Sequence, residues 1–219
     1  MSAEKVREQL YAEKAVVILR ENNADLVRKK AHAARDAGLR IQEITWTTPS
    51  VAELIREFTK EKLGTIGAGT ILTVDDAKKA VDAGATFLVS PIYTPEVSAW
   101  AKKKDVVYIP GAATPQEIMR AWQDGCRPVK VFPVPDFGGP AYIKHVLAPL
   151  PFLELLPTGG LGLEDVKPYL DAGAKAVGLG AKFTHTPAVL AGDYASLTEQ
   201  GTKVIELVRG ANPKVAVKV

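Results

Sequence analysis

The sequence has a single cysteine, Cys126, among its 219 residues, and this scarcity excludes an internal disulfide. A lone cysteine fits a reducing compartment, and we expect Cys126 to be a small packed side chain rather than a nucleophile. Histidine is nearly as scarce. The three residues His32, His145 and His185 lack metal-ligand spacing, and no HExxH or Cys/His motif is present. We therefore expect neither a bound metal nor another cofactor.

Long apolar runs and one-sided charge are also missing. No segment approaches about 18 consecutive apolar residues, so we expect no membrane helix. The polar segment 1–8 lacks the apolar core of a signal peptide. The 28 basic and 25 acidic residues give a net charge of only +3 and are spread along the chain, which argues against a nucleic-acid surface. These absences leave a cytoplasmic enzyme acting on a small molecule as the expected class.

A regular alternation of strand and helix signals runs through the whole sequence. The expected strands are short runs rich in β-branched and aliphatic residues: residues 15–20, 40–46, 65–70, 86–91, 106–109, 129–132, 152–158 and 174–178. The expected helices end at or near glycine, and two of them begin with a threonine N-cap: residues 2–12, 23–37, 73–83, 114–124 and 163–172.

Repeated strand–helix units in a chain of this length predict an α/β protein with a single (β/α)8 TIM barrel. No break in composition marks a linker, so we expect one domain over residues 1–219. It comprises a leading helix at 1–12, the barrel at 13–210 and a tail at 211–219. The alternative is an open doubly wound sheet, which would normally carry a glycine-rich turn after the first strand. Residues 20–23, Arg-Glu-Asn-Asn, do not form one.

Lys130 lies in the run Val129-Lys130-Val131-Phe132, which is typical of a buried strand. Burying an ammonium group is costly unless the group is paired or loses its proton. A lysine desolvated in this way becomes an amine nucleophile near neutral pH, as Schiff-base catalysis requires. The alternative is a lysine at a strand end that extends to solvent.

Other polar residues also occur at the expected strand ends, where barrel enzymes carry their catalytic groups. Because side chains alternate along a strand, Glu43, Thr45 and Thr47 share one face, as do Lys130 and Phe132. Arg20, Thr70 and Thr158 end three further strands. Each of these residues could instead have a structural role, such as an ion pair at a strand edge or a helix cap. Together they indicate a site at one mouth of the barrel.

Two glycine-rich turns, at residues 158–162 and 178–181, follow the seventh and eighth expected strands. Barrels commonly bind phosphate at this place through backbone N–H groups. Glycine lets the main chain approach an anion closely. Gly159, Gly160, Gly180 and Ala181 are therefore candidate phosphate ligands.

Six motifs stand in order along the chain and together resemble one family. They are Gln42-Glu43-Ile44-Thr45, Ile66-Gly67-Ala68-Gly69-Thr70, Val89-Ser90-Pro91, Ile109-Pro110-Gly111, Val129-Lys130-Val131-Phe132-Pro133 and Pro157-Thr158-Gly159-Gly160. The sequence resembles the 2-keto-3-deoxy-6-phosphogluconate (KDPG) aldolases over residues 13–210. That family includes the aldolases of 4-hydroxy-2-oxoglutarate (KHG) and of 2-keto-3-deoxy-6-phosphogalactonate. The resemblance implies a (β/α)8 barrel, usually a homotrimer, that acts as a metal-independent lyase through a lysine Schiff base.

The resemblance also implies roles for individual residues. Lys130 would form the Schiff base and Glu43 would be the general acid and base. The substrate would be bound by the following residues: Arg20, Thr45, Thr47, Thr70, Pro91, Phe132, Thr158, Gly159, Gly160, Gly180 and Ala181. Among them, Thr70 would contact the pyruvyl carboxylate, Phe132 would pack beside the imine, and the glycines with Ala181 would hold the phosphate.

Two positions depart from the family pattern. Some members have arginine at the position of Thr47, where it binds the carboxylate, and Arg20 is the nearest replacement by strand order. Many members have serine at the position of Ala181, so one hydrogen bond to phosphate is absent. Residues 137–144 resemble the galactonate branch of the family.

The expected activity is class I cleavage of KDPG into pyruvate and glyceraldehyde 3-phosphate, a reaction of carbohydrate metabolism in the Entner–Doudoroff pathway. Cleavage of KHG or of 2-keto-3-deoxy-6-phosphogalactonate is the alternative, since the sequence does not fix the preferred epimer or chain length. A phosphosugar isomerase or epimerase barrel, or a non-catalytic phosphosugar-binding barrel, is a further reading. We expect small-molecule partners and no binding to nucleic acid or membrane.

Overall fold

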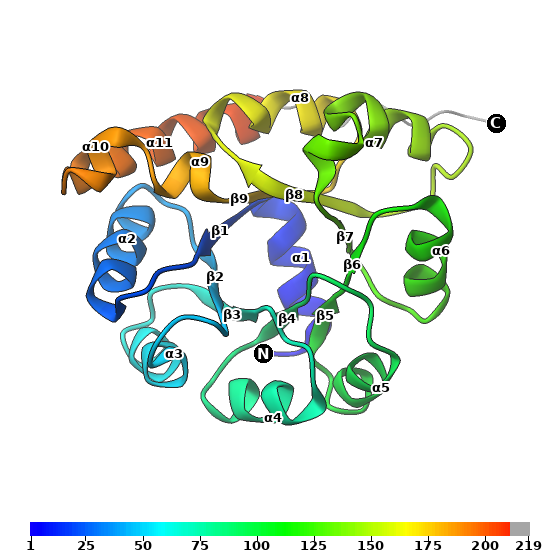
Figure 1. The fold of residues 1–219 in the computed structure, drawn as a ribbon, viewed down its shortest axis with the longest axis horizontal. Coiled ribbons are helices and arrows are strands. Elements are labelled where there is room, and N and C mark those ends of the chain that lie inside the picture. Colours follow the sequence, from blue (N-terminus) through cyan, green and yellow to red (C-terminus); the bar gives the residue numbers. More distant parts are fainter. Residues whose placement is uncertain (211–219) are drawn as a thin grey trace.

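A parallel β-sheet forms the centre of the structure, a computed structural model that describes residues 1–210. The expected tail at 211–219 lies outside the described residues. The strands are β1 (Ala15–Leu19), β2 (Ile41–Thr45), β3 (Thr65–Gly69), β4 (Phe87–Val89), β5 (Val107–Ile109), β6 (Gly111–Ala112), β7 (Val129–Val131), β8 (Leu155–Leu161) and β9 (Val177–Leu179). Their order in the sheet is β5-β4-β3-β2-β1-β9-β8-β7-β6. Figure 1 shows this sheet curving around a common axis.

The sheet nearly closes into a barrel at Pro110. Its two outermost strands, β5 and β6, are consecutive in the chain and are separated only by this proline. On one side, the Ser90 N–H donates to the Ile109 carbonyl oxygen (3.1 Å), and on the other the Lys130 N–H donates to the Pro110 carbonyl oxygen (2.9 Å). Proline lacks the N–H that a continuous ladder needs, so the strand expected at 106–109 ends at Ile109, and a further short strand that was not predicted begins at Gly111. The predicted α/β barrel is thereby confirmed.

Helices surround the sheet and face solvent on their outer sides (Figure 1). They are α2 (Ala24–Asp36), α3 (Val51–Lys60), α4 (Val74–Asp82), α5 (Pro95–Lys103), α6 (Pro115–Gln123), α7 (Gly139–Leu147), α8 (Val166–Asp171), α9 (Ala181–Thr184), α10 (Pro187–Leu190) and α11 (Tyr194–Gly210), with short 3-10 turns at Val134–Phe137 and Leu163–Asp165. The two predicted caps are confirmed. The Thr73 side chain accepts from the Asp76 N–H, and Thr114 and Glu117 form a capping box.

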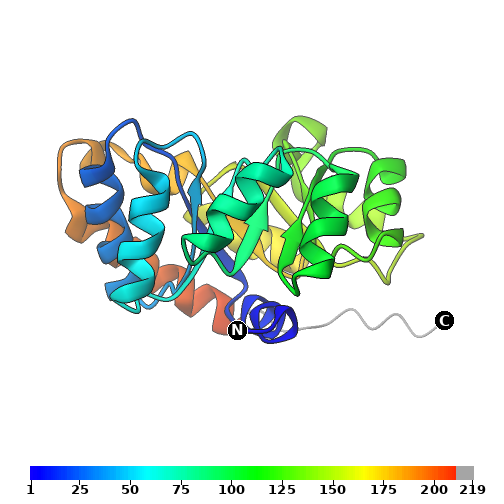
Figure 2. The same ribbon diagram turned by 90° about the horizontal axis from the view of Figure 1, so that it is seen from below.

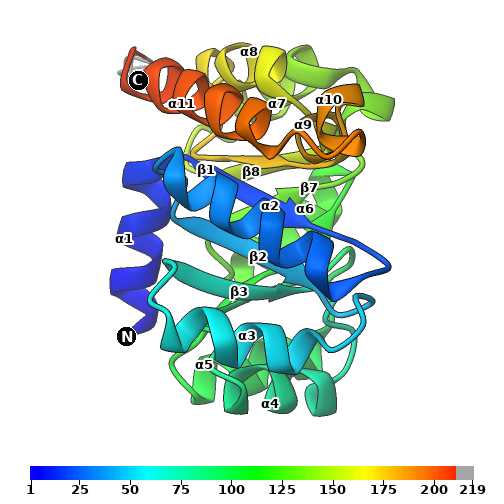
Figure 3. The same ribbon diagram turned by 90° about the vertical axis from the view of Figure 1, so that its left-hand side faces the viewer.

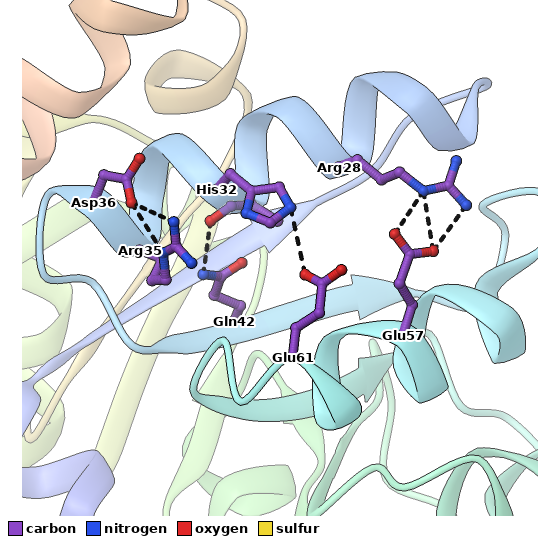
Figure 4. Close-up of polar contacts among 8 residues, drawn as sticks. Arg28, His32, Arg35, Asp36, Gln42, Glu57 and Glu61 are labelled. Atoms are coloured by element: carbon purple, nitrogen blue, oxygen red, sulfur yellow. Dashed lines mark hydrogen bonds and ion pairs between the residues drawn. The ribbon is translucent and has the colours of Figure 1, made fainter.

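Polar contacts join neighbouring helices on the outside of the barrel, as Figure 4 shows for α2, α3 and β2. Arg28 on α2 donates to both carboxylate oxygens of Glu57 on α3, with Nε at 2.8 and 3.0 Å. His32 Nε2 lies 3.5 Å from Glu61 Oε2. Gln42 on β2 is fully buried and donates from Nε2 to a backbone carbonyl of α2 at 3.1 Å. These contacts fix the two helices on the strand that carries Glu43.

A leading helix, α1 (Ala3–Glu13), lies across the end of the barrel where the strands begin (Figures 2 and 3). Its side chains Val6 and Leu10 are 2% exposed and pack with the apolar side chains inside the barrel. Tyr11 donates its hydroxyl proton to Glu154 at 2.5 Å. The predicted N-terminal helix is therefore present, and it covers the end of the barrel opposite the strand carboxyl ends.

Most expected strands differ from the observed ones by a few residues at their ends, and the strand expected at 174–178 is β9 at Val177–Leu179. One of them also differs in its shape. The sequence predicts a strand at 152–158 followed by a glycine turn, whereas β8 runs from Leu155 to Leu161 and contains both glycines. Thr158 pairs with Gly178 and Leu161 pairs with Leu179, so two extra residues bulge out of the strand. Gly159 and Gly160 adopt φ values of 142° and 72° there, which side chains disfavour. The glycines therefore form a bulge within β8 rather than a turn after it.

No helix within residues 1–210 is long and apolar enough to cross a lipid bilayer.

Candidate active site

A cavity of about 460 Å³ opens at the carboxyl ends of the barrel strands. All of the predicted site residues line it except Thr45 and Thr47, and those lining it are Arg20, Glu43, Thr70, Pro91, Lys130, Phe132, Thr158, Gly159, Gly160, Gly180 and Ala181. The structure thus brings together side chains from strands at both ends of the sequence, as expected for a parallel barrel.

Lys130 projects from β7 into the cavity and is 7% exposed. Burial lowers the pKa of its ammonium group from the usual value, because the charged form loses hydration. The carboxyl group of Glu43 opposes this shift, and the positive charge of Arg20 adds to it. The Lys130 Nζ lies 4.9 Å from the centre of the Phe132 ring. The lowered pKa increases the fraction of free amine near neutral pH.

Glu43 projects from β2 into the same cavity and is 3% exposed. Burial raises the pKa of its carboxyl group, while the charges of Lys130 and Arg20 act in the opposite direction. Within residues 1–210, no side-chain hydrogen bond or ion pair holds the Glu43 carboxyl group or the Lys130 ammonium group. Both end groups are therefore available to a molecule in the cavity. A carboxyl group with a raised pKa can both donate and accept a proton near neutral pH.

Gly69, at the end of β3, provides the space that the Glu43 carboxyl group occupies. A Cβ added at Gly69 would lie 1.8 Å from Glu43 Oε1 and 2.5 Å from its Cδ. Only glycine at this position allows the observed orientation of Glu43.

Substituting Gly69→Ala should displace the Glu43 carboxyl group and lower kcat on the order of 100-fold, the scale of a 1 Å misplacement of a reacting group. Steady-state cleavage kinetics measure this effect, and the thermal unfolding midpoint serves as the control for folding. As a matched comparison, the same substitution is made in the Glu43→Gln variant. If Gly69 acts through Glu43, Gly69→Ala should cause little further loss in that background. An equal loss in both backgrounds would contradict this role.

Arg20 and Thr70 lie side by side at the cavity wall, where Arg20 Nη2 donates to Thr70 Oγ1 at 3.3 Å. Thr70 has a φ of 60°, which is unfavourable for a β-branched residue. Such a conformation persists only where the surroundings enforce it, and it is common at functional sites. The pair presents a guanidinium group and a hydroxyl group to the cavity, a combination suited to a carboxylate.

Thr45 and Thr47 do not reach the cavity. Thr45 is fully buried, and its Oγ1 lies 3.2 Å from the hydroxyl oxygens of both Thr47 and Thr48. Thr47 is exposed in the turn that follows β2. Strand alternation predicts that both share the face of Glu43, but the chain turns after Thr45. Their hydroxyl groups therefore contact one another and stabilise this turn.

Backbone rather than side chains forms the wall at the β8 bulge. A Cβ added at Gly180 would lie 3.1 Å from the Gly160 Cα and 3.2 Å from its nitrogen, so the two segments touch through their main chains. A Cβ at Gly160 would meet no atom within 4 Å. Ala181 is exposed and lines the cavity beside these glycines. This wall can bring backbone N–H groups close to an anion.

Three cavity residues are absent from the sequence prediction: Ile18, Thr184 and His185. The sequence contains one indication for Thr184 and His185, because both follow closely after Gly180 and Ala181, which are predicted site residues. From the sequence, the histidines are considered as metal ligands and not as residues that line a substrate cavity. Within residues 1–210, no group of three or more His, Cys, Asp or Glu side chains is placed to hold a metal ion.

Comparison with known proteins identifies similar sequences and folds. The model of the family described as KDPG and KHG aldolase matches residues 6–200. The 2-dehydro-3-deoxy-phosphogluconate aldolase of Treponema pallidum is 34% identical over 81% of this chain and 85% of its own length.

Two solved structures extend the comparison. A native KDPGal structure superposes with a TM-score of 0.80 at 28% identity, covering 90% of this chain and 95% of its own. The KDPG aldolase of Legionella pneumophila, with pyruvate captured at low pH as a covalent carbinolamine intermediate, has a TM-score of 0.80 at 26% identity. That match covers 90% of this chain and 97% of the other.

Proposed function

The chain belongs to the KDPG and KHG aldolase family, and from this membership and the geometry of the cavity we propose that it is a class I aldolase of KDPG. It would cleave KDPG into pyruvate and glyceraldehyde 3-phosphate. The observation that carries this proposal is the convergence of a buried amine, Lys130, and a buried carboxyl group, Glu43, on one cavity. An isomerase, an epimerase or a purely binding barrel would not need a desolvated lysine.

The reaction begins with attack of the Lys130 amine on the C2 ketone of the substrate. The resulting carbinolamine loses water when the Glu43 carboxyl group, directly or through a water molecule, protonates the departing hydroxyl group. The iminium ion that forms withdraws electrons from C3. This activation is internal to the protein, so we propose a metal-independent reaction. The captured carbinolamine in the Legionella relative supports an amine nucleophile of this kind.

Cleavage follows when Glu43, now a carboxylate, accepts the proton of the C4 hydroxyl group. The C4–O electrons form the aldehyde, the C3–C4 bond breaks, and its electron pair passes through C3 to the iminium nitrogen as an enamine. Glyceraldehyde 3-phosphate leaves. The enamine then takes a proton at C3, and water hydrolyses the imine to release pyruvate and the Lys130 amine.

The rest of the cavity suits the two anionic ends of such a substrate. Arg20 and Thr70 would hold the carboxylate next to C2, which places Arg20 in the role of the arginine that some relatives carry at the position of Thr47. The bulge at Gly159 and Gly160 and the start of α9 at Ala181 would hold the phosphate through backbone N–H groups, since the Gly180 N–H already donates to the Leu161 carbonyl oxygen. Phe132 would pack against the imine.

The substrate assignment is tested by a coupled cleavage assay that compares KDPG, KHG and 2-keto-3-deoxy-6-phosphogalactonate. We expect the highest kcat/KM with KDPG. A preference for the galactonate epimer is the second candidate, because a KDPGal structure superposes well and residues 137–144 resemble that branch. Trapping with pyruvate and borohydride tests the lyase class independently. Failure to form a covalent adduct would reject the Schiff-base mechanism for all three substrates.

We also propose that the enzyme is a cytoplasmic homotrimer, as the family resemblance implies. Leu72, Ile92 and Phe137, which follow β3, β4 and β7, are 44%, 56% and 42% exposed. These exposed apolar side chains at the rim of the barrel support burial against another subunit. Light scattering of the purified protein measures the oligomeric state, and a monomer at micromolar concentration would contradict the proposal.

Substituting Ala181→Asp should weaken phosphosubstrate binding, because it places a carboxylate beside the proposed phosphate site. We expect kcat/KM for KDPG to fall by on the order of tenfold or more, while adduct formation with pyruvate stays unchanged. Ala181→Ser is the matched control, because serine is close to alanine in size and uncharged. Its added hydroxyl group should bind the phosphate slightly better than wild type does. If Ala181→Asp leaves the kinetics of KDPG cleavage intact, the phosphate binds elsewhere.

A further inference from the structure

A buried ion pair lies behind the wall of the cavity. It joins Glu21, which follows β1, to Lys30 on α2, with 2.5 Å between Lys30 Nζ and Glu21 Oε1. The side chains are 2% (Lys30) and 6% (Glu21) exposed, and neither lines the cavity. Replacing such a pair by apolar side chains is often neutral or stabilising. Net stability therefore does not account for the pair, but its short contact holds the Glu21 carboxylate in one orientation.

The same Glu21 oxygen also contacts the end of α9. His185, directly after this helix, places its Nε2 3.1 Å from Glu21 Oε1. Its Nδ1 lies 2.9 Å from Thr184 Oγ1, which in turn lies 3.2 Å from the Gly180 carbonyl oxygen. A neutral ring with its proton on Nε2 donates to Glu21 and leaves Nδ1 free to accept, so the contact needs no charge on His185. Glu21 is thereby joined through side chains to both ends of α9.

The two neighbours of Glu21 lie at opposite ends of the cavity. Arg20 directly precedes Glu21 and lines the proposed carboxylate site, whereas Ala181, at the start of α9, lines the proposed phosphate site. With only four residues, α9 is too short to be a stable helix by itself. The fully buried Phe183 anchors its middle, and the contact of His185 with Glu21 fixes its carboxyl end. Glu21 therefore links the two places where the proposed substrate carries negative charge.

We propose that Glu21 is a positioning residue that sets the distance between the two anion sites of the cavity. The proposal rests on the proposed function, because it concerns the same substrate and the same cavity. Lys30 keeps the Glu21 carboxylate directed at His185, and His185 holds α9 at a fixed distance from β1. A substrate with a negative charge at each end must span both sites and depends on this distance. A substrate that carries only the carboxylate does not.

The experiment compares two double variants, each of which removes the ion pair without leaving a buried charge unpaired. In Glu21→Gln with Lys30→Met, the glutamine oxygen can still accept from His185, whereas in Glu21→Leu with Lys30→Met no acceptor remains. The value of kcat/KM is measured for KDPG and for 2-keto-3-deoxygluconate, which lacks only the phosphate. We expect the ratio of the two values to fall about tenfold in the leucine variant, through a higher KM for KDPG. In the glutamine variant it should stay within about twofold of wild type.

A third variant removes the same contact from its other side. His185→Phe leaves the ion pair intact and should lower the ratio by a similar factor. Combined with the leucine double variant, it should cause little further loss, because both changes break one contact. The control is Lys182→Gln, which removes an exposed cation of α9 that lies 3.5 Å from Glu164 on the outside. It should leave the ratio within about twofold.

The outcomes separate this inference from the proposed function. If the glutamine and leucine variants lose the preference for KDPG equally, or if the leucine variant loses kcat for both substrates at an unchanged ratio, the positioning role of Glu21 is rejected. A borohydride adduct of the wild type with pyruvate then leaves the aldolase assignment standing. A wild type without this adduct rejects both. If the leucine variant does not fold, His185→Phe decides: a lowered ratio supports the inference, and an unchanged ratio rejects it.

Discussion

The variant Lys130→Met is expected to lose cleavage by roughly 10⁴-fold or more, the scale of loss when a covalent nucleophile is removed. Methionine fills a similar volume but cannot form an imine. In wild type, pyruvate and borohydride should add one lactyl-type mass to the peptide containing Lys130, as mass spectrometry of a digest measures. In the variant this adduct should be absent.

The same variant should fold at least as stably as the wild type. The pKa of Lys130 is lower in the folded chain than in the unfolded chain, so the unfolded chain binds the proton more tightly. Below the unfolded pKa of about 10.4, this difference costs stability, and methionine removes the cost. Lys182→Met is the matched control, because Lys182 is exposed near the cavity and should remain dispensable. Labelling of a lysine other than Lys130 would overturn the assignment.

Glu43→Gln should lower kcat by roughly 10²- to 10⁴-fold, because glutamine retains the shape of glutamate but cannot shuttle protons. Exchange of deuterium into the methyl group of pyruvate should slow in parallel, as NMR measures. KM should change little, since Glu43 is proposed to act on protons rather than to bind the substrate. A Glu43→Gln variant that exchanges and cleaves at wild-type rates would remove Glu43 from the mechanism.

The pH dependence of the same variant gives a second measurement. The carboxyl group of Glu43 raises the pKa of Lys130 in the wild type, against the lowering by burial and by Arg20. Glutamine has no charge, so the Lys130 pKa should fall further in Glu43→Gln. The rate of borohydride trapping should therefore reach half its maximum at a lower pH than in the wild type. A shift to higher pH would contradict the proximity of the two groups.

The barrel and the burial of Lys130 and Glu43 in its cavity were predictable because their signals are local. Lys130 and Glu43 each interrupt an apolar strand, and strand alternation is enough to direct them inward. The caps at Thr73 and Thr114 are equally local, and both are confirmed. By contrast, Ser50 and Glu53 at the start of α3 have the spacing of a capping box, but Ser50 has a φ of 56° and its side chain forms no cap bond, so this local signal does not describe the observed helix start.

The features that the sequence did not predict depend on contacts between distant segments. The bulge at Gly159 and Gly160 exists because β8 pairs with β9 in a shifted register, which β8 alone does not encode. Thr45 does not line the cavity, and its hydroxyl oxygen instead lies beside those of Thr47 and Thr48 in the turn after β2. His185 gains its environment from Glu21, which lies near the other end of the chain. Such arrangements become visible only once the strands are placed side by side.

Pro110 separates the chain into two blocks of consecutive strands within one continuous sheet, and this division also partitions the proposed reaction. Strands β1 to β5 carry Glu43, the proposed proton shuttle, whereas β6 to β9 carry Lys130, the proposed nucleophile. The blocks meet on the far side through the pairing of β1 with β9, where Ala15 is opposite Val177. Neither block holds a complete set of reacting groups. Turnover should therefore require that both junctions have formed.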